Sequence, residues 1–345
     1  MTRTVPLGLL DQHGRRATDL RVSLTDKCNL RCTYCMPAEG LSWLPKPELL
    51  TDAEIVRLVR IAVGELGVRS VRFTGGEPLL RPTLPELIAR TAAIGAEVGE
   101  RLDLALTTNG IGLGRIAPAL REAGLRRLNV SLDTLDRERF AQMTRRDRLG
   151  DVLAGLAAAQ EAGLTPVKVN AVLIRGVNDT EAPALLRFCL ERGYELRFIE
   201  QMPIDADHQW SRDHLVTAEE ILASLAGSFT LTPAVEARGS APAERWTVDG
   251  GPATVGVIAS VTRPFCRACN RTRLTADGQV RNCLFATGET DLRGLLRGGA
   301  SDDEIADRWR AAMWPKAAAR GIAEGEAAAE TGFAEPSRSM SAIGG

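Results

Sequence analysis

The sequence predicts an α/β protein whose core is an incomplete barrel of six β–α units, followed by a C-terminal α+β extension. Three observations lead to this expectation. Short apolar runs alternate with amphipathic helical segments between residues 19 and 216, an order that produces parallel strands with helices outside. Polar motifs follow these strands at their C-terminal ends, where barrels place their chemistry. Six units, where a closed barrel has eight, leave the barrel incomplete.

The composition is that of a globular protein. The chain has 345 residues, of which 44% are hydrophobic and 25% are charged, as is typical of folded domains. A net charge of −1 provides no overall field to attract nucleic acid or an anionic membrane, so neither is an expected partner. No apolar run reaches the about 18 residues that a membrane span needs, and the N-terminus lacks the apolar core of a signal peptide.

The predicted elements follow one another along the chain. Residues 1–18 are polar and are expected to form an N-terminal arm. The first helix opens with Thr51 and Glu54, whose spacing is that of a capping box. Apolar runs predict strands at 19–26, 70–74, 102–106, 127–131, 167–174 and 195–199. Helical spacing predicts helices at 51–66, 83–98, 114–123, 136–143, 150–162 and 180–192.

The regular alternation ends near residue 216. A helix near 217–226 is followed by short β-like pieces with glycine and proline between them, then by helices near 290–297 and 302–313. Residues 314–345 are rich in small residues and are expected to form a flexible tail that ends in Gly344-Gly345. The expected organisation is therefore an arm over 1–18, a barrel over 19–216, a C-terminal region over 217–313 and a tail over 314–345.

Three cysteines lie directly after the first predicted strand. Cys28, Cys32 and Cys35 have the spacing C-x3-C-x2-C, and only a short loop can turn them toward one centre. Three thiolates are one short of the four that hold an ordinary iron–sulfur cluster. A cubane cluster here would keep one iron free to bind a second molecule. Half of a zinc site and simple buried thiols are the alternatives, but no histidine or fourth cysteine lies nearby.

A second group of three cysteines lies in the C-terminal region. Cys266, Cys269 and Cys283 have the spacing C-x2-C-x13-C, and the last returns after a predicted hairpin. A structural zinc site lacking its fourth ligand is the main alternative to a second open cluster. Cys189 lies on the apolar side of a predicted helix and is interpreted as a core thiol. Seven cysteines without an export signal indicate a reducing, cytoplasmic setting and metal ligation rather than disulfides.

Two further patterns indicate ligand binding. Gly75-Gly76-Glu77-Pro78 ends a strand, and its glycines would let the backbone approach a ligand closely, although an ordinary turn would also use them. Several predicted barrel strands carry cations, which are costly to bury without a partner. Cationic side chains that face the solvent on alternate strand positions would avoid that cost. Cationic side chains that face inward would together bind a polyanion such as a triphosphate. The cations are Arg21, Arg72, Lys168 and Arg197, with Arg271 and Arg273 nearby.

The first cysteine motif, with Tyr34 before its last cysteine, resembles the signature of the radical S-adenosylmethionine (SAM) superfamily. Both cysteine groups, the run Arg271-Thr272-Arg273 and the terminal Gly-Gly together resemble the GTP 3′,8-cyclase family of molybdenum cofactor biosynthesis. The similarity extends from about residue 19 to 313 and resumes at the tail. It implies an incomplete (β/α)6 TIM-like barrel of the radical SAM type, with a second cluster carried by the C-terminal extension.

The resemblance also implies roles for particular residues. Cys28, Cys32 and Cys35 would hold a 4Fe-4S cluster that binds SAM, and Cys266, Cys269 and Cys283 would hold a second 4Fe-4S cluster that ligates GTP. The implied SAM contacts are Tyr34, Gly75, Gly76, Glu77, Ser131 and Met202. The implied GTP contacts are Arg21, Arg72, Thr107, Lys168, Arg197, Arg271, Thr272 and Arg273. The implied catalytic residues are Arg271, Arg273, Gly344 and Gly345. The tail departs from the family pattern, because Ala342 stands where an aromatic residue is common.

The implied reaction is the first step of molybdopterin synthesis. Reductive cleavage of SAM gives a 5′-deoxyadenosyl radical, which takes a hydrogen from the ribose of GTP and leads to (8S)-3′,8-cyclo-7,8-dihydroguanosine 5′-triphosphate. The implied partners are an electron donor of the flavodoxin or ferredoxin type and a downstream cyclic pyranopterin monophosphate synthase, and the expected state is a monomer or homodimer. One alternative is a radical SAM enzyme of the peptide- or sulfatase-maturation type, which tends to carry more C-terminal cysteines. The other is a zinc or iron–sulfur regulatory protein.

Overall fold

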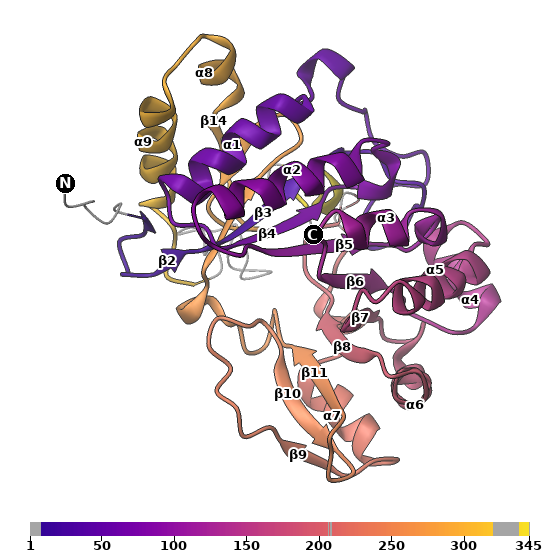
Figure 1. Ribbon diagram of the computed structural model, residues 1–345. Helices are drawn as coiled ribbons and strands as arrows, with labels where there is room; N and C mark the ends of the chain where they lie inside the picture. Colours follow the sequence, from indigo (N-terminus) through magenta and orange to yellow (C-terminus); the bar gives the residue numbers. More distant parts are fainter. Residues whose placement is uncertain (1–7, 206, 208, 320–337, 345) are drawn as a thin grey trace.

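A twelve-stranded mixed sheet organises the computed structural model, which describes residues 8–205, 207, 209–319 and 338–344 (Figure 1). Strands hydrogen-bond in the order β14-β13-β12-β3-β4-β5-β6-β7-β8-β11-β10-β9. All six predicted barrel strands are present and run parallel. They are β3 (Asp19–Ser23), β4 (Ser70–Thr74), β5 (Asp103–Thr108), β6 (Arg127–Ser131), β7 (Val167–Leu173) and β8 (Glu195–Glu200).

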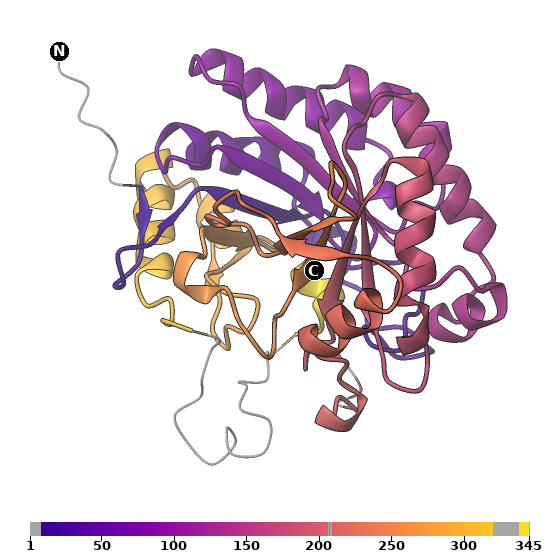
Figure 2. The ribbon, with the colours of Figure 1, turned by 90° about the horizontal axis from the view of Figure 1, so that it is seen from below.

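Helices connect these strands and lie along the outer side of the sheet (Figure 2). The capping box predicted at Thr51 and Glu54 is formed and begins the first of them. The predicted helix 114–123 is instead a 3-10 turn at Leu113–Arg115 followed by a shorter α-helix. The helices are α1 (Asp52–Gly64), α2 (Leu84–Glu97), α3 (Ala117–Glu122), α4 (Arg137–Thr144), α5 (Leu149–Glu161) and α6 (Ala182–Arg192).

Two strands from beyond residue 216 extend the parallel part of the sheet at both edges. β11 (Thr254–Ile258) pairs in parallel with β8, and β12 (Arg271–Leu274) pairs in parallel with β3. Eight neighbouring strands therefore run parallel. The division of the chain at residue 216 stays a prediction, but the segments on either side of it share one sheet.

The other C-terminal elements flank these two strands. β9 and β10 add an antiparallel edge beside β11, and β13 and β14 add one beside β12. Helix α9 packs against α1 and β13, and its Trp309 is fully buried. The bounds are α7 (Ala218–Ala226), β9 (Leu231–Pro233), β10 (Glu244–Val248), β13 (Gln279–Arg281), β14 (Thr290–Asp291), α8 (Arg293–Arg297) and α9 (Asp302–Met313).

The N-terminal arm is more ordered than its polar sequence suggests. β1 (Leu9–Leu10) and β2 (Arg16–Ala17) form a small antiparallel pair, and Leu9 is fully buried. Arg15 lies between them and donates to the carbonyl oxygens of Cys266 at 2.7 Å and Ala317 at 2.6 Å. The arm therefore fastens the second cysteine group to the segment that follows α9.

The C-terminal segment lies on the inner side of the sheet, opposite the helices (Figure 2). The prediction of a flexible tail is wrong for residues 338–344, which include the short helix α11 (Met340–Ile343). Ile343 is fully buried and Ser341 is 3% exposed. The segment fits because its residues are small where the interior is tight, a feature that composition alone does not distinguish from disorder.

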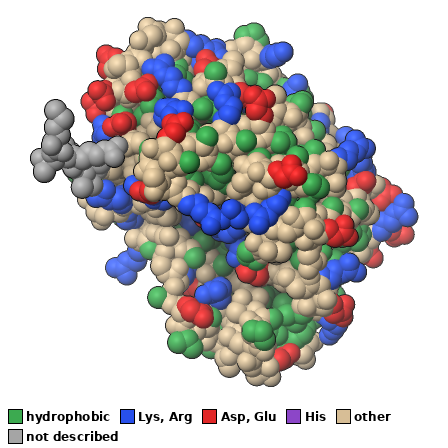
Figure 3. Space-filling model, in the orientation of Figure 1, with side chains coloured by type: hydrophobic (Ala, Val, Ile, Leu, Met, Phe, Trp, Pro, Cys, Tyr) green, Lys and Arg blue, Asp and Glu red, His purple; other side chains and the backbone are tan. Residues whose placement is uncertain are grey.

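The surface in Figure 3 mixes acidic and basic side chains, with one basic band across the middle of this face. Within the described parts of the chain, no helix is long and apolar enough to cross a membrane.

The carboxylate of Glu200 joins three segments at the end of β8. It is fully buried and accepts hydrogen bonds from the amides of Ala218 (2.7 Å), Val261 (2.7 Å) and Thr262 (2.8 Å). We expect Glu200→Ala to lower the free energy of unfolding by about 3 to 5 kcal/mol, because it leaves buried amide donors unpaired. Urea denaturation measures this.

The exposed Glu219, in the first turn of α7, provides the matched control. Glu219→Ala should change the free energy of unfolding by less than about 1 kcal/mol. Equal effects of the two substitutions would contradict the role assigned to Glu200.

Candidate active site

A cavity of about 200 Å³ opens at the C-terminal ends of the parallel strands. All three cysteines of the first group line it, together with every residue predicted to contact SAM. Strand ends supply most of the remaining lining, as expected for a parallel sheet with helices outside. The predicted lining residues are Cys28, Cys32, Cys35, Tyr34, Gly75, Gly76, Glu77, Thr107, Ser131 and Met202.

The three thiols of this cavity are buried close to one another. Burial raises the pKa of Cys28 to about 11 and that of Cys35 to about 12, and the Cys28 sulfur adds to the effect at Cys35. The pKa of Cys32 is also raised well above its usual value, by burial and by the neighbouring Cys35. Thiolates here would repel one another unless a cationic group lay between them. The three sulfurs and their shared cavity therefore fit an iron–sulfur cluster as ligand.

The glycine pair of the Gly75-Gly76-Glu77 motif packs against the loop that leads into the cysteines. A Cβ on Gly76 would lie 2.3 Å from the carbonyl oxygen of Lys27, and Gly75 has a φ of 139°. The amides of Gly76 and Glu77 donate to the carbonyl oxygens of Thr25 and Lys27, both at 2.7 Å. The sequence predicts that these glycines admit a ligand. The structure shows that they also admit the backbone of the cysteine loop, which is the tighter requirement.

Glu77 is the carboxylate at the centre of this arrangement. It is 1% exposed and accepts hydrogen bonds from the hydroxyl of Thr108 (2.6 Å), the amide of Asn109 (2.7 Å) and the amide of Leu79 (3.0 Å). Burial outweighs these donors and raises the pKa of Glu77 to about 7. Near neutral pH, a small change in the surroundings of Glu77 therefore suffices to protonate or deprotonate its carboxyl group.

The raised pKa of Glu77 makes folding stability depend on pH. Its usual value is 4.5, so the folded protein holds the proton more tightly than the unfolded chain. The resulting stabilisation is complete below about pH 4.5 and is lost as the pH rises to about 7. A rise from 4.5 to about 7 corresponds to about 3 kcal/mol. Glu77→Gln does not titrate at this position. Between pH 4.5 and 8, the unfolding free energy of the wild type should therefore fall by that amount relative to that of Glu77→Gln.

Urea denaturation at several pH values measures this difference. Asp133, whose pKa burial raises to about 6, titrates in both proteins and cancels. Parallel pH profiles for the two proteins would show that Glu77 is not the responsible group.

Two lining residues were missed by the sequence analysis. The hydroxyl of Tyr34 donates to Asp133 at 2.6 Å, and Asp133 also accepts from the amide of Val172 at 2.8 Å. The side chain of Asn109 donates to Asn29 at 2.6 Å, inside the cysteine loop. Both Asp133 and Asn109 follow strands at their C-terminal ends, and this position was the available signal.

Arginines gather inside the sheet next to this cavity. Pairing across β12, β3 and β4 aligns Arg273 with Arg21 and Arg21 with Arg72. Burial lowers the pKa of Arg21 to about 9 and that of Arg72 to about 10, and neighbouring guanidinium groups contribute. The same holds for Arg197 (about 10) and Arg273 (about 9).

Several of these guanidinium groups have a donor without a partner. The buried Nε atoms of Arg21, Arg72, Arg197 and Arg271 make no hydrogen bond among the described residues. Several buried cations with spare donors form an environment that favours an anion, since each would gain both a charge partner and a hydrogen bond. Of the two alternatives that the sequence left open, the buried Nε atoms favour inward-facing cations at these positions.

Of the other predicted GTP contacts, Thr107 lines the cysteine cavity, whereas Thr272 and Lys168 lie elsewhere. The side chain of Thr272 points to the outer face of β12, where its hydroxyl accepts from Trp309 at 3.0 Å. Strand alternation between Arg271 and Arg273 requires this orientation. The GTP contact implied for Thr272 stays a prediction, and its backbone rather than its side chain would have to make it. Lys168 pairs with Glu195 and lines, with Arg197, a separate cavity of about 500 Å³ near the start of β8.

The second cysteine group lies beside the arginines. Cys269 and Cys283 are both close enough to Arg273 to raise its pKa against the effect of burial. Burial alone would raise the pKa of the Cys269 thiol, but the Lys316 ammonium and the Arg271 guanidinium outweigh it and lower that pKa to about 7. Lys316 is 3% exposed, and its Nζ lies 3.4 Å from the Cys269 sulfur. A thiolate at Cys269 is thus favoured, as ligation of iron requires.

Lys316 was not identified from the sequence, because the segment that carries it was interpreted as part of a flexible tail. Cys189, interpreted as a core thiol, is indeed fully buried in α6.

The end of the chain reaches the same interior. The carbonyl oxygen of Gly344 accepts from the Arg273 guanidinium. Gly344 has a φ of 73°, and a Cβ there would lie 2.5 Å from the Ser23 hydroxyl and 2.7 Å from a Thr74 methyl carbon. Glycine is therefore required by both conformation and space. Gly345 lies outside the described residues.

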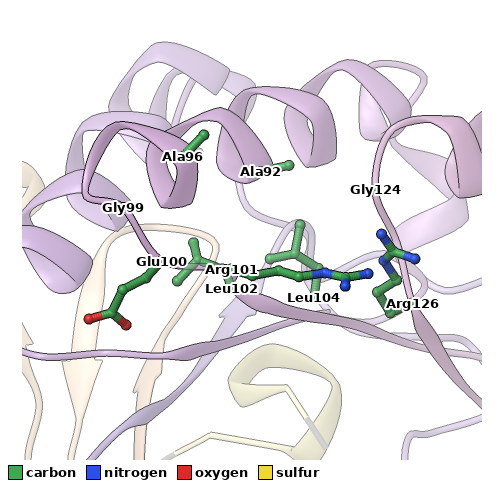
Figure 4. A pocket seen from close by; sticks show the side chains of 9 residues that line it. All are labelled: Ala92, Ala96, Gly99, Glu100, Arg101, Leu102, Leu104, Gly124 and Arg126. Atoms are coloured by element: carbon green, nitrogen blue, oxygen red, sulfur yellow. The ribbon is translucent and has the colours of Figure 1, made fainter.

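A further cavity, of about 300 Å³, lies away from these groups, between α2 and the loops that precede β5 and β6 (Figure 4). Arg101 and Arg126 project across it, but none of the described cysteines lines it. The chemistry-bearing side chains therefore concentrate at the cysteine cavity and the arginines next to it.

This fold and this cavity define a radical SAM protein. Residues 22–189 match the Radical SAM superfamily, and residues 194–321 match the family Molybdenum Cofactor Synthesis C. A solved structure of Streptococcus suis SuiB bound to S-adenosylmethionine has a similar fold, with a TM-score of 0.58 and 13% identity. The similarity covers 85% of this chain and 68% of that one.

The chain belongs to the GTP 3′,8-cyclase family. It is 65% identical to the GTP 3′,8-cyclase of Streptomyces coelicolor over 98% of this chain and 96% of that protein. The proteins of that name from Mycobacterium sp. (strain KMS) and Corynebacterium glutamicum are 63% and 57% identical over 98% of this chain, and the matches cover 93% and 89% of their own lengths.

Proposed function

We propose that this chain is a GTP 3′,8-cyclase that converts GTP, with SAM as co-substrate, to (8S)-3′,8-cyclo-7,8-dihydroguanosine 5′-triphosphate in the first step of molybdenum cofactor synthesis. One observation supports the substrate most strongly. A group of buried arginines with unpaired Nε donors includes Arg21, which lies close enough to Cys269 of the second cysteine group to interact with it electrostatically. A triphosphate is the kind of ligand that several converging guanidinium groups bind.

Each cysteine group would hold one 4Fe-4S cluster, the first through Cys28, Cys32 and Cys35 and the second through Cys266, Cys269 and Cys283. The clusters would supply one electron for SAM cleavage and an open iron for the guanine base. The chain itself would bind and orient the two substrates. Its architecture would be the incomplete (β/α)6 barrel over 19–216, extended by the cluster-bearing region over 217–313.

The residues around SAM would act by position and charge. The Glu77 carboxylate, poised near neutral pH, would take its charged form beside a ligand ammonium group. Tyr34, Gly75, Gly76, Ser131 and Met202 line the same cavity and would exclude water from the reacting carbon.

The residues around GTP would hold its phosphates and ribose. Arg21, Arg72 and Arg197 would bind the triphosphate, with Lys168 and Thr107 at its edges. Arg271, Arg273 and Gly344 would lie nearest the reacting nucleoside, where an arginine can neutralise charge as the new ring closes. Gly345 is proposed to act with Gly344 at the end of the tail.

Anaerobic reconstitution tests this proposal. Iron and sulfide are counted per chain, SAM, dithionite and a nucleotide are added, and 5′-deoxyadenosine is followed by chromatography. About eight irons are expected from two 4Fe-4S clusters, with 5′-deoxyadenosine formation that depends on GTP and not on ATP. About four irons per chain, or SAM cleavage that does not depend on the nucleotide, would be consistent with a radical SAM enzyme but would exclude the cyclase activity.

Other proposed partners follow from this function. They are an electron donor of the flavodoxin or ferredoxin type and a cyclic pyranopterin monophosphate synthase that consumes the product, both in the cytoplasm.

A further inference from the structure

The C-terminal segment 338–344 contacts the rest of the chain along its whole length. Met340 packs against an apolar cluster that includes Phe285, and Cys283 packs on the same cluster. The amide of Ser341 donates to the Cys35 sulfur, and Gly344 lies beside Arg273. The segment thus contacts Cys35 of the first cysteine group and packs on the same apolar cluster as Cys283 of the second. A shift of the segment would therefore change the surroundings of both cysteine groups.

Arg338 is the first described residue of this segment, and it makes the strongest polar contacts. Its two terminal nitrogens donate to the two carboxylate oxygens of Asp277, at 2.9 and 2.8 Å. The same guanidinium lies 2.8 Å from the carboxylate of Glu289. A paired geometry with one carboxylate and a second carboxylate nearby is among the strongest ionic arrangements in proteins.

Both acidic partners are themselves held in place. Asp277 is 5% exposed, lies in the turn between β12 and β13, and accepts from the Thr275 hydroxyl at 2.6 Å. Glu289 precedes β14 and pairs with Arg281, which is fully buried. The Arg338 contacts therefore fasten the segment to the edge of the sheet rather than to a mobile loop.

The two ends of the segment are attached to the same strand. β12 carries Arg273, which donates a hydrogen bond to the carbonyl oxygen of Gly344, and the turn that follows β12 carries Asp277. With Arg338 fixed at that turn, only five residues connect it to Gly344, so the backbone runs directly from the turn to Arg273 in the interior.

We infer that Arg338 is a positioning residue. Its ionic contacts with Asp277 and Glu289 hold the C-terminal segment inside the sheet and so set the place of Gly344 next to Arg273. The contribution to turnover rests on the function proposed above, whereas the anchoring itself does not. Without the anchor, the remaining contacts of residues 340–344 would have to hold the segment alone.

Hydrogen exchange followed by mass spectrometry tests the anchor in the reconstituted protein. In Arg338→Ala, amides 341–343 should exchange about 10- to 100-fold faster, since charged hydrogen bonds of this kind are lost. Arg338→Lys should restore part of the protection, and Asp277→Asn should reproduce the loss without adding to it in the double variant. Arg57→Ala is the matched control. It removes an ion pair of similar length, between Arg57 of α1 and Asp302 of α9 at 2.8 Å, and should leave the exchange of amides 341–343 unchanged.

Turnover supplies a second readout. Arg338→Ala should lower kcat for cyclised product with unchanged iron content, and Arg338→Lys should recover part of it. Unchanged exchange in Arg338→Ala overturns the anchor, and faster exchange with wild-type kcat overturns the positioning role. If the wild type makes no GTP-dependent product, the proposed function fails, while the exchange data still decide whether Arg338 anchors the segment.

Discussion

Replacing Cys32 by alanine should abolish SAM cleavage. Cys32 lies between two other thiols in the cavity that also contains Glu77 and Tyr34, and two thiolates do not hold a cubane cluster in place of three. We expect no detectable 5′-deoxyadenosine and a loss of about half of the iron. Iron analysis and chromatography of the anaerobic reaction measure both.

Two other cysteine-to-alanine variants serve as comparisons for Cys32→Ala. Cys269→Ala should also lose about half of the iron, but it should keep reductive SAM cleavage and lose the cyclised product. Cys189→Ala removes a buried thiol from α6, away from both groups, and should keep iron and product alike. Cyclisation by Cys269→Ala would exclude the second-cluster role of that residue.

Replacing Arg72 by methionine should weaken GTP binding without weakening the fold. Arg72 is 6% exposed, its Nε has no partner among the described residues, and its Nη1 donates a long hydrogen bond of 3.5 Å to the hydroxyl of Thr107. Removing one desolvated charge from a phosphate site costs about 2 to 4 kcal/mol of binding, or about 30- to 1000-fold in Kd. Calorimetric titration of the reconstituted protein measures this loss.

The same substitution should leave the free energy of unfolding unchanged or raise it by about 1 to 3 kcal/mol, because burying a cation whose Nε has no hydrogen-bond partner among the described residues is costly. Arg60→Met is the control, since Arg60 is exposed and pairs with Glu97 on the outer helices. It should alter neither quantity. A strongly destabilised Arg72→Met protein, or one with wild-type affinity, would contradict an anion-binding role.

The order of the central sheet could be predicted from the sequence, because each β–α unit is a local pattern whose neighbour follows it in the chain. The two outer parallel strands could not. β12 pairs with β3 although some 250 residues separate them, as Arg271 lies opposite Asp19. Pairing over such a distance depends on sheet edges that exist only in the folded protein, and no local periodicity reports it.

The site divides in a similar way. Cysteine spacing and the strand-end position of the motif Gly75-Gly76-Glu77-Pro78 indicated the first cavity, because these signals are local, whereas Ser131 came from the family resemblance alone. Lys316 and Arg338 were missed because each acts across a long separation in sequence. The orientation of the Thr272 side chain, which faces Trp309, was not part of the prediction, because the run of three residues was considered as one unit although alternate residues of a strand face opposite sides.

The two late strands also have a consequence for synthesis of the protein. While a ribosome has translated only the first 250 residues, β3 and β8 are both unpaired at one edge, because β12 and β11 do not yet exist. Unpaired edges of this kind invite association between nascent chains. The high contact order of these pairings delays completion of the sheet until nearly the whole chain has emerged. Expression yield should therefore depend on translation rate and chaperones, and fragments that end before residue 254 should aggregate.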